Sequence, residues 1–171
     1  MLKSPENLGV IHFIGIGGIG MSGIAEILFQ SGYNVQGSDI TDGNNTNRLK
    51  KLGIKVYIGQ KKSNILNAKL VVVSTAISPK NIEYMTAKKM FLPVVHRSEM
   101  LGELMRLKQS IAIAGTHGKT TTTSLIAKMI EENGMDPTII NWGIISALES
   151  NAKLGNGEWM VVEADESDGS F

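Results

Sequence analysis

The chain has 171 residues, which is enough for one domain or for one domain and part of a second. Its 17 Lys and Arg residues against 16 Asp and Glu residues leave a net charge of +1, so no overall field favours nucleic acid or a membrane surface as a partner. The absence of Cys excludes disulfides and thiolate metal sites, and no apolar run approaches the roughly 18 residues of a membrane helix, so we expect a soluble cytoplasmic protein.

The first chemical signature is a glycine-rich turn that joins an apolar strand candidate to a helix candidate at residues 24–30. Gly15, Gly17 and Gly20 of the sequence GIGGIGMSG fit the GxGxxG pattern, whose glycines allow a tight turn and close approach to a diphosphate. Asp39 ends the next strand candidate, where the pattern requires a carboxylate for ribose hydroxyls. The pattern indicates a dinucleotide-type site, although a glycine turn that only packs a helix against a strand would look the same.

Strands and helices alternate through the rest of this first unit, which predicts a doubly wound parallel sheet. We expect helices at residues 48–52, 81–89 and 99–107, the last with Ser98 as its N-cap, and strands at residues 55–59, 70–74 and 92–95. Ser74, Thr75 and Arg97 follow expected strands at their carboxyl ends, where ligands bind in open parallel sheets. The serine and threonine are equally compatible with a plain turn, whereas the guanidinium of Arg97 favours contact with an anion.

The second signature is the sequence IAIAGTHGKTTTTSL at residues 111–125, in which an apolar strand candidate leads through a glycine turn into a helix. In this order, backbone N–H groups point at phosphate oxygens, Lys119 reaches the terminal phosphates of a nucleotide triphosphate, and the Thr120 hydroxyl ligates Mg²⁺. The pattern GxxxxGK[ST] fails because Ile113 stands at its first glycine, but the shorter form GTxGK[ST] holds. A glycine turn without a ligand does not explain a lysine at the start of the helix.

The segment after this phosphate loop carries the expected metal ligand. We expect the helix to end near residue 133, followed by a strand at 138–140, an ill-defined segment at 142–154 and a strand at 158–162. Glu163 lies at the tip of the last strand, where phosphate-loop proteins place the acid that holds their metal. Mg²⁺ prefers carboxylate and phosphate oxygens, so Thr120 and Glu163 are the predicted ligands.

Together these motifs resemble the Mur ligase family. The resemblance extends over residues 11–171 and rests on the sequences GIGGIGMSGIAEIL, GSD, RSEML, GTHGKTTTT and EADESDGSF. It implies an ATP-dependent ligase of peptidoglycan synthesis, in which the γ-phosphate of ATP activates the carboxylate of UDP-N-acetylmuramate as an acyl phosphate. The amine of L-alanine would then attack this acyl phosphate, while Lys119 and Mg²⁺ neutralise the charge of the transferred phosphate.

The resemblance also implies which residues bind each substrate, with a nucleotide sugar and not NAD at the first glycine turn. The expected UDP-sugar residues are Gly15, Gly17, Gly18, Ile19, Gly20, Met21 and Ser22 at the diphosphate, Asp39 at the uridine, and Ser74, Thr75 and Arg97 on the same side. The expected ATP residues are Gly115, Thr116, His117, Gly118, Lys119, Thr120 and Thr121, with Lys119 as the catalytic residue and Thr120 and Glu163 as the Mg²⁺ ligands.

By this resemblance the chain divides into a Rossmann-like UDP-sugar-binding domain at residues 1–107 and the truncated start of a P-loop α/β ATP-binding domain at residues 108–171. We therefore expect these residues to bind the nucleotide sugar without catalysing ligation alone. Trp142 departs from the family pattern, which has a glycine at this position. Three alternatives stay open: a ligase that recycles a tripeptide onto the same sugar nucleotide, a non-catalytic nucleotide-sugar binding module, and an NAD-dependent dehydrogenase, which would leave the phosphate loop without a role.

Overall fold

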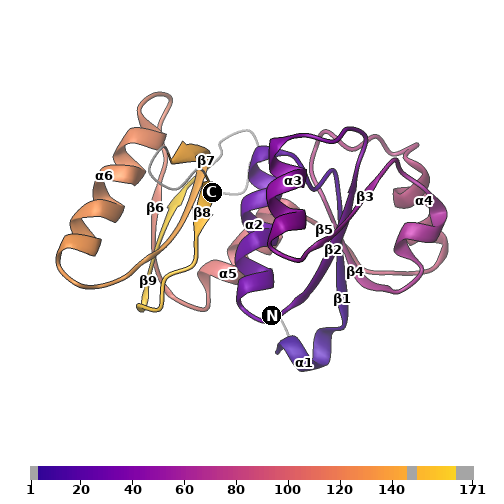
Figure 1. Ribbon diagram of the computed structural model, residues 1–171, viewed down its shortest axis with the longest axis horizontal. Helices are drawn as coiled ribbons and strands as arrows, with labels where there is room; N and C mark the ends of the chain where they lie inside the picture. Colours follow the sequence, from indigo (N-terminus) through magenta and orange to yellow (C-terminus); the bar gives the residue numbers. More distant parts are fainter. Residues whose placement is uncertain (1–3, 146–149, 165–171) are drawn as a thin grey trace.

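The computed structural model describes residues 4–145 and 150–164, whose strands form two sheets (Figure 1). The first part of the chain contains α1 (Pro5–Leu8), β1 (Val10–Ile14), α2 (Ile19–Gln30), β2 (Asn34–Asp39), α3 (Asn44–Lys51), β3 (Lys55–Ile58), the 3₁₀ helix η1 (Lys62–Ile65), β4 (Ala68–Val73), α4 (Ile82–Lys89), β5 (Val94–His96) and α5 (Arg97–Met105). The second part contains β6 (Gln109–Ile113), α6 (Lys119–Glu132), β7 (Thr138–Ile145), β8 (Ser150–Lys153) and β9 (Trp159–Glu163). Within the described residues, none of these helices is long and apolar enough to cross a membrane.

The first sheet has the strand order β3-β2-β1-β4-β5, and each neighbouring pair is parallel. Helices α2, α3 and α5 cover one of its faces, and α4 with η1 covers the other (Figure 1). Leu70 and Val72 of β4 belong to the core on one face, and Val71 belongs to the core on the other, which explains the uninterrupted apolar run at residues 70–73 of this strand. The predicted doubly wound parallel sheet is confirmed.

The second sheet has the strand order β6-β9-β7-β8, in which β6 and β7 pair parallel to β9 and β8 pairs antiparallel to β7. Helix α6 covers one face of this sheet, and α2 of the first unit covers the other, so that α2 lies between the two sheets (Figure 1). As a result α2 is buried on all sides over residues 20–28, unlike an amphipathic surface helix. Gly23 of α2 permits this helix to lie close to β8, because a Cβ atom at Gly23 would lie 2.9 Å from the side-chain nitrogen of Asn151.

A polar cluster ties the second sheet to two helices of the first unit. The guanidinium of Arg48 on α3 donates hydrogen bonds to Glu26 of α2 and to Ser150 of β8. It also donates to Oδ1 of Asn151 at 2.8 Å, and Asn151 donates to the carbonyl oxygen of Ile19 in the first turn of α2. Burial raises the pKa of Glu26, while Arg48 and Ser150 act in the opposite direction. The cluster therefore supplies the buried carboxylate with the cation that it needs.

A second buried polar cluster lies under α4, on the opposite face of the first sheet. Its centre is the carboxylate of Glu83, which has no exposed surface. The hydrogen-bond donors to this carboxylate are Nε2 of His12 at 3.1 Å, Oγ of Ser38 at 2.5 Å, the backbone N–H of Lys61 at 3.0 Å and Nδ2 of Asn64 at 2.6 Å. Because these donors come from β1, β2 and the η1 region, one side chain joins α4 to three other segments of the fold.

Three helices begin earlier than the sequence predicts, and one of them is α3, which begins at Asn44 and not at residue 48. Helix α2 begins at Ile19, inside the glycine motif, and not at residue 24, because packing between two sheets outweighs the low helix propensity of its glycines. Helix α5 begins at Arg97 with His96 as its N-cap, so the prediction of Ser98 as the N-cap is wrong. Nδ1 of His96 accepts a hydrogen bond from the backbone N–H of Ser98, and an imidazole thereby takes the role expected of a serine hydroxyl.

The segment predicted as ill-defined, residues 142–154, contains most of a β-hairpin. Strand β7 extends to Ile145, and β8 pairs with it so that Ile140 lies opposite Ala152. Strand β8 was not predicted because its sequence is SNAK, and the buried polar side chains of Ser150 and Asn151 do not show the apolar alternation of a strand. Residues 146–149 and 165–171, which include most of the EADESDGSF motif, lie outside the described residues.

Candidate functional site

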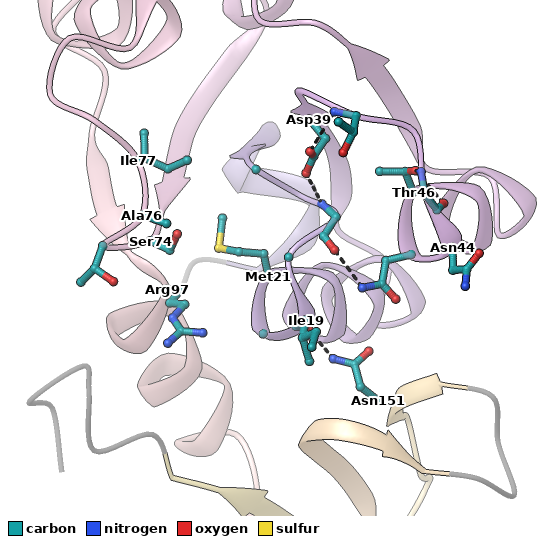
Figure 2. Close-up of a pocket in the computed structure, with 18 residues that line it drawn as sticks. Ile19, Met21, Asp39, Asn44, Thr46, Ser74, Ala76, Ile77, Arg97 and Asn151 are labelled. Carbon is teal, nitrogen blue, oxygen red and sulfur yellow. Dashed lines mark hydrogen bonds between the residues drawn. The ribbon is translucent and has the colours of Figure 1, made fainter.

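A cavity of about 700 Å³ lies beside the first glycine turn, at the carboxyl ends of β1, β2 and β4 (Figure 2). Strand β1 lies between β2 and β4, so the cavity is at the point where the strand order reverses, which is where open parallel sheets bind ligands. The predicted sugar-nucleotide residues that line it are Gly15, Gly17, Gly18, Ile19, Gly20, Met21, Asp39, Ser74, Thr75 and Arg97. The structure therefore brings together residues that the sequence presents in separate segments.

Ser22 is the predicted sugar-nucleotide residue that the structure does not bring to the cavity. Its side chain is fully buried, and its Oγ donates a hydrogen bond of 2.9 Å to the carbonyl oxygen of Ile19 within α2. The same Oγ lies 3.5 Å from Oδ1 of Asn151, so the side chain faces the second sheet. The Ser22 hydroxyl therefore lies in the interface between α2 and the second sheet.

The glycine turn directs the N-terminus of α2 toward the cavity. Gly15 has a φ of 79°, which residues with a side chain rarely adopt. The N–H groups of Gly15 and Ile16 both donate to the carbonyl oxygen of Ser38, at 2.8 and 2.9 Å, and so fasten the turn to β2. The first backbone N–H groups of an α-helix have no partner within the helix, and its dipole favours negative charge there. The turn can therefore bind the phosphate groups of a nucleotide.

The carboxylate of Asp39 orders this turn. Its Oδ2 accepts a hydrogen bond of 2.8 Å from the N–H of Gly17, and its Oδ1 accepts one of 3.3 Å from the N–H of Thr41 (Figure 2). A Cβ atom at Gly17 would lie 2.9 Å from the same Oδ2, so the contact requires glycine at this position. Asn45 donates from Nδ2 to the carbonyl oxygen of Gly17 at 2.8 Å. The turn is thus held at both the N–H and the carbonyl group of Gly17.

Several residues of the cavity were not predicted from the sequence. They are Thr41, Gly43, Asn44, Asn45, Thr46, Ala76, Ile77 and Asn151. The first turn of α3 supplies Asn44, Asn45 and Thr46. The N–H of Gly43 donates to Oγ1 of Thr46 at 2.7 Å, as in a capping box. The spacing of Gly43 and Thr46 in the sequence was therefore the signal that could have indicated this helix start. Asn151 comes from the second sheet, 132 positions after Ile19, and no local pattern points to it.

The second candidate site is the loop between β6 and α6. Gly115 and Gly118 have φ angles of 142° and 77°, and Gly118 is the N-cap of α6, so the loop turns sharply before the helix. Lys119 is the first residue of α6, and its Nζ donates a hydrogen bond of 2.5 Å to the carbonyl oxygen of Gly115. The predicted ATP residues that are exposed here are Thr116, His117, Gly118 and Thr121. The loop thus presents a helix N-terminus and a lysine to solvent.

The carboxylate predicted as a metal ligand lies against the start of α6. Glu163 ends β9 and is 4% exposed. Its Oε2 accepts hydrogen bonds of 2.9 Å from Oγ1 of Thr120 and from the backbone N–H of Trp142. Thr120 and Glu163 therefore lie together, as the metal assignment requires. In the part of the chain that the structure describes, no three His, Cys, Asp or Glu side chains gather to hold a metal, so phosphate oxygens and water would have to complete this site.

A match to a protein family includes most of the first of these two sites. Residues 10–109 match the model of the Mur ligase family, catalytic domain. The chain belongs to the Mur ligase family. The matched range contains the first sheet and the glycine turn, so in this Mur ligase chain the GxGxxG pattern does not by itself indicate NAD. The phosphate loop follows directly after the matched range.

A curated relative extends the similarity over the whole Mur ligase chain. The UDP-N-acetylmuramate–L-alanine ligase of Parvibaculum lavamentivorans is 63% identical over 171 residues. The alignment covers 100% of this chain but only 35% of the relative. The chain therefore spans about a third of the length of the curated relatives that it matches.

Solved structures share the Mur ligase fold of the chain. The UDP-N-acetylmuramate-alanine ligase of Thermotoga maritima superposes with a TM-score of 0.87 at 36% identity, over 93% of this chain and 37% of that protein. The UDP-N-acetylmuramate:L-alanyl-gamma-D-glutamyl-meso-diaminopimelate ligase of Neisseria meningitides superposes with a TM-score of 0.85 at 28% identity, over 93% of this chain and 53% of that protein. These similarities confirm the predicted fold class, a Rossmann-like parallel sheet followed by a P-loop α/β unit.

Proposed function

We propose that the chain is part of an ATP-dependent ligase that joins L-alanine to UDP-N-acetylmuramate in peptidoglycan synthesis. The observation that supports this most directly is the contact of Thr120 with Glu163 beside the phosphate loop, in a chain that also has a glycine-lined cavity suited to a nucleotide diphosphate. An NAD-dependent dehydrogenase would use the cavity and leave Lys119 and Glu163 without a role. A relative that is 63% identical bears the name of this ligase.

In this proposal residues 1–107 form the domain that binds the sugar nucleotide in the cytoplasm. The N–H groups of the first glycine turn and of the N-terminus of α2 would hold the diphosphate. Arg97, at the cavity wall, would contact a carboxylate or phosphate oxygen, because its planar guanidinium matches both. Asp39 would contact the uridine part while it orders Gly17, and Ser74 and Thr75 would face the ligand from the end of β4.

Residues 108–171 would bind ATP with Mg²⁺, and the residues of the phosphate loop fit this ligand. Lys119 would exchange its contact with the carbonyl oxygen of Gly115 for the terminal phosphates, where charge-assisted hydrogen bonds are stronger. Thr120 and Glu163 would hold Mg²⁺, which neutralises phosphate charge when it is bound. His117 would support the phosphates without transferring a proton, because phosphoryl transfer depends mainly on alignment and on charge neutralisation.

Calorimetry and a phosphate-release assay with the full-length protein test the proposal. We expect UDP-N-acetylmuramate to bind without ATP, ATP to bind more tightly with Mg²⁺, and phosphate to be released when L-alanine is added to both. Binding of UDP-N-acetylmuramate without ATP-dependent phosphate release would indicate a binding module. Binding of NADH, with no affinity for the sugar nucleotide, would indicate a dehydrogenase.

A second candidate is a ligase that attaches a tripeptide to the same sugar nucleotide. The TM-score of 0.85 with the tripeptide ligase of Neisseria meningitides favours it almost as well as the score of 0.87 favours an alanine ligase. Competition between L-alanine and L-alanyl-γ-D-glutamyl-meso-diaminopimelate as acceptors of the full-length protein separates the two. We expect L-alanine to be the preferred acceptor, and preference for the tripeptide would reverse the assignment.

Replacement of Glu163 by glutamine tests the metal assignment separately. The amide keeps an oxygen for Thr120 and for the N–H of Trp142 but removes the negative charge. We expect the affinity of the ATP complex for Mg²⁺ to fall by about 10- to 100-fold, measured by titrating Mg²⁺ at a fixed ATP concentration. Glu158, which is exposed just before β9, provides the control Glu158→Gln with an unchanged titration. A wild-type Mg²⁺ titration in Glu163→Gln would remove Glu163 from the metal site.

A further inference from the structure

Trp142 of β7 touches residues of both candidate sites. Its indole ring lies against the guanidinium of Arg97, with 4.6 Å between Cζ of Arg97 and the ring centroid. A Cβ atom at Gly20 would collide with Cζ3 of this ring and with Nη1 of Arg97, so the three residues are packed together. The backbone N–H of Trp142 donates to Oε2 of Glu163 at 2.9 Å, which fixes the strand from which the ring projects.

The ring restricts a side chain that lines the sugar-nucleotide cavity. Arg97 lies at the edge of that cavity, near Ser74 and Met21 (Figure 2). An arginine side chain loses much rotamer freedom when it binds a ligand, and this loss weakens binding unless the side chain is already ordered. An aromatic face orders the guanidinium plane by a cation–π contact, and a guanidinium whose plane is fixed matches the geometry of a carboxylate or phosphate group.

We propose that Trp142 is a positioning residue that holds the guanidinium of Arg97 ready for the anionic part of the sugar nucleotide, a carboxylate or phosphate oxygen. This inference rests on the proposed function, in which the cavity binds UDP-N-acetylmuramate. Gly20 contributes to this arrangement as well as to the glycine turn, since a side chain at this position would occupy the space of the Trp142 ring.

The indole N–H provides a way to separate the ring face from the rest of the side chain. Among the described residues, Nε1 of Trp142 has no hydrogen-bond acceptor although the atom is buried. Phenylalanine keeps an aromatic face and removes this unsatisfied donor, so Trp142→Phe is expected to fold at least as stably as the wild-type protein. Alanine removes the face itself.

A double-mutant cycle in the full-length protein tests the inference. The dissociation constant of UDP-N-acetylmuramate is measured by calorimetry for the wild type, Trp142→Ala, Arg97→Ala and the double variant. We expect each single variant to bind about tenfold more weakly, and the double variant to bind no more weakly than Arg97→Ala, because Trp142 acts through Arg97. Trp142→Phe is expected to bind within about threefold of the wild type.

UDP-N-acetylglucosamine, which lacks the carboxylate of the muramate, distinguishes the two sources of the anion. Equal weakening of both ligands by Trp142→Ala would show that Arg97 holds the diphosphate. Weakening of the muramate alone would show that Arg97 holds the carboxylate. Either result supports the positioning role.

Unchanged or tighter binding by Trp142→Ala would overturn the inference, and tighter binding would show that the ring obstructs the site. Additive losses in the double variant, or equal losses in Trp142→Ala and Trp142→Phe, would also overturn it. A wild-type affinity in Arg97→Ala would remove Arg97 from the site and this inference with it. Failure of the wild-type protein to bind UDP-N-acetylmuramate would instead reject the proposed function itself.

Discussion

Replacement of Lys119 by alanine is expected to weaken ATP binding by the full-length protein about tenfold to a hundredfold, and to lower kcat about a hundredfold to a thousandfold. Lys119 begins α6, and its Nζ lies 2.5 Å from the carbonyl oxygen of Gly115 in the phosphate loop. The variant loses the cation that would move from this carbonyl to the phosphate oxygens and stabilise the transferred phosphate. Calorimetry with ATP and a phosphate-release assay measure the two effects separately.

Lys128 provides a matched control on the same helix. Its side chain is 70% exposed, with Nζ 3.8 Å from Glu132, so Lys128→Ala removes the same charge without touching the phosphate loop. An exposed ion pair contributes little to stability, and we expect ATP affinity and kcat of this variant to equal those of the wild type. Wild-type ATP affinity in Lys119→Ala, or an equal loss in Lys128→Ala, would refute the assignment of the loop.

Replacement of Glu83 by alanine is expected to lower the free energy of unfolding by about 3–5 kcal/mol. The carboxylate has no exposed surface and accepts hydrogen bonds from four donors, two of which are His12 at 3.1 Å and Asn64 at 2.6 Å. Its removal leaves these buried donors unsatisfied and opens a gap beneath α4. Urea denaturation measures the loss, and the melting temperature of a chain of this size should fall by roughly 6–20 °C.

Two comparisons make the Glu83 prediction specific. Glu132→Ala removes an acid whose side chain is 68% exposed, and it should change stability by no more than about 0.5 kcal/mol. A loss in Glu83→Ala as small as this would contradict the structural role of the buried cluster. Glu83→Gln keeps the size of the side chain, but its NH₂ group meets donors where the carboxylate accepted, so a loss is expected here also.

The pH dependence of stability should carry the signature of the same carboxylate. Burial raises the pKa of Glu83, but hydrogen bonds from His12, Ser38 and Asn64 outweigh burial and bring the pKa below its ordinary value. For an acid whose pKa is lower in the folded state, the stabilisation is present above the pKa of the unfolded chain and is lost as the pH falls through the folded pKa. Wild-type stability should therefore decrease below pH 4.5, the ordinary value, and this decrease should be shallower in Glu83→Gln.

Local motifs made the two glycine turns predictable. The GxGxxG turn and the GTHGKT loop each join a strand to a helix within a few residues, and the N–H groups proposed to bind phosphate come from that same stretch of backbone. The position of Glu163 followed from the same rule, since a parallel strand places its last residue at the edge of the sheet where the loop lies. These features depend on short-range geometry, which a few consecutive residues specify.

Contacts between distant segments were not predictable in this way. Strand β8 was missed because Ser150 and Asn151 are polar, and they are buried only because Arg48 and α2 meet them from the first unit. Ser22 followed the glycine motif in the sequence, yet its hydroxyl faces the second sheet and not the cavity. The burial of Glu83 depends on donors from three other segments, and no spacing in the sequence shows that they meet.

The sequence by itself therefore determined the doubly wound sheet, both glycine turns, and the residue types at the phosphate loop, because each arises from a strand, a turn and a helix that follow one another directly. Only the tertiary structure decided that α2 lies between two sheets and that Trp142 contacts Arg97. It also decided that Asn151 lines the cavity and that Ser22 does not. These outcomes depend on how two sheets pack on one helix, and packing is set by the fit of side chains that are far apart along the chain.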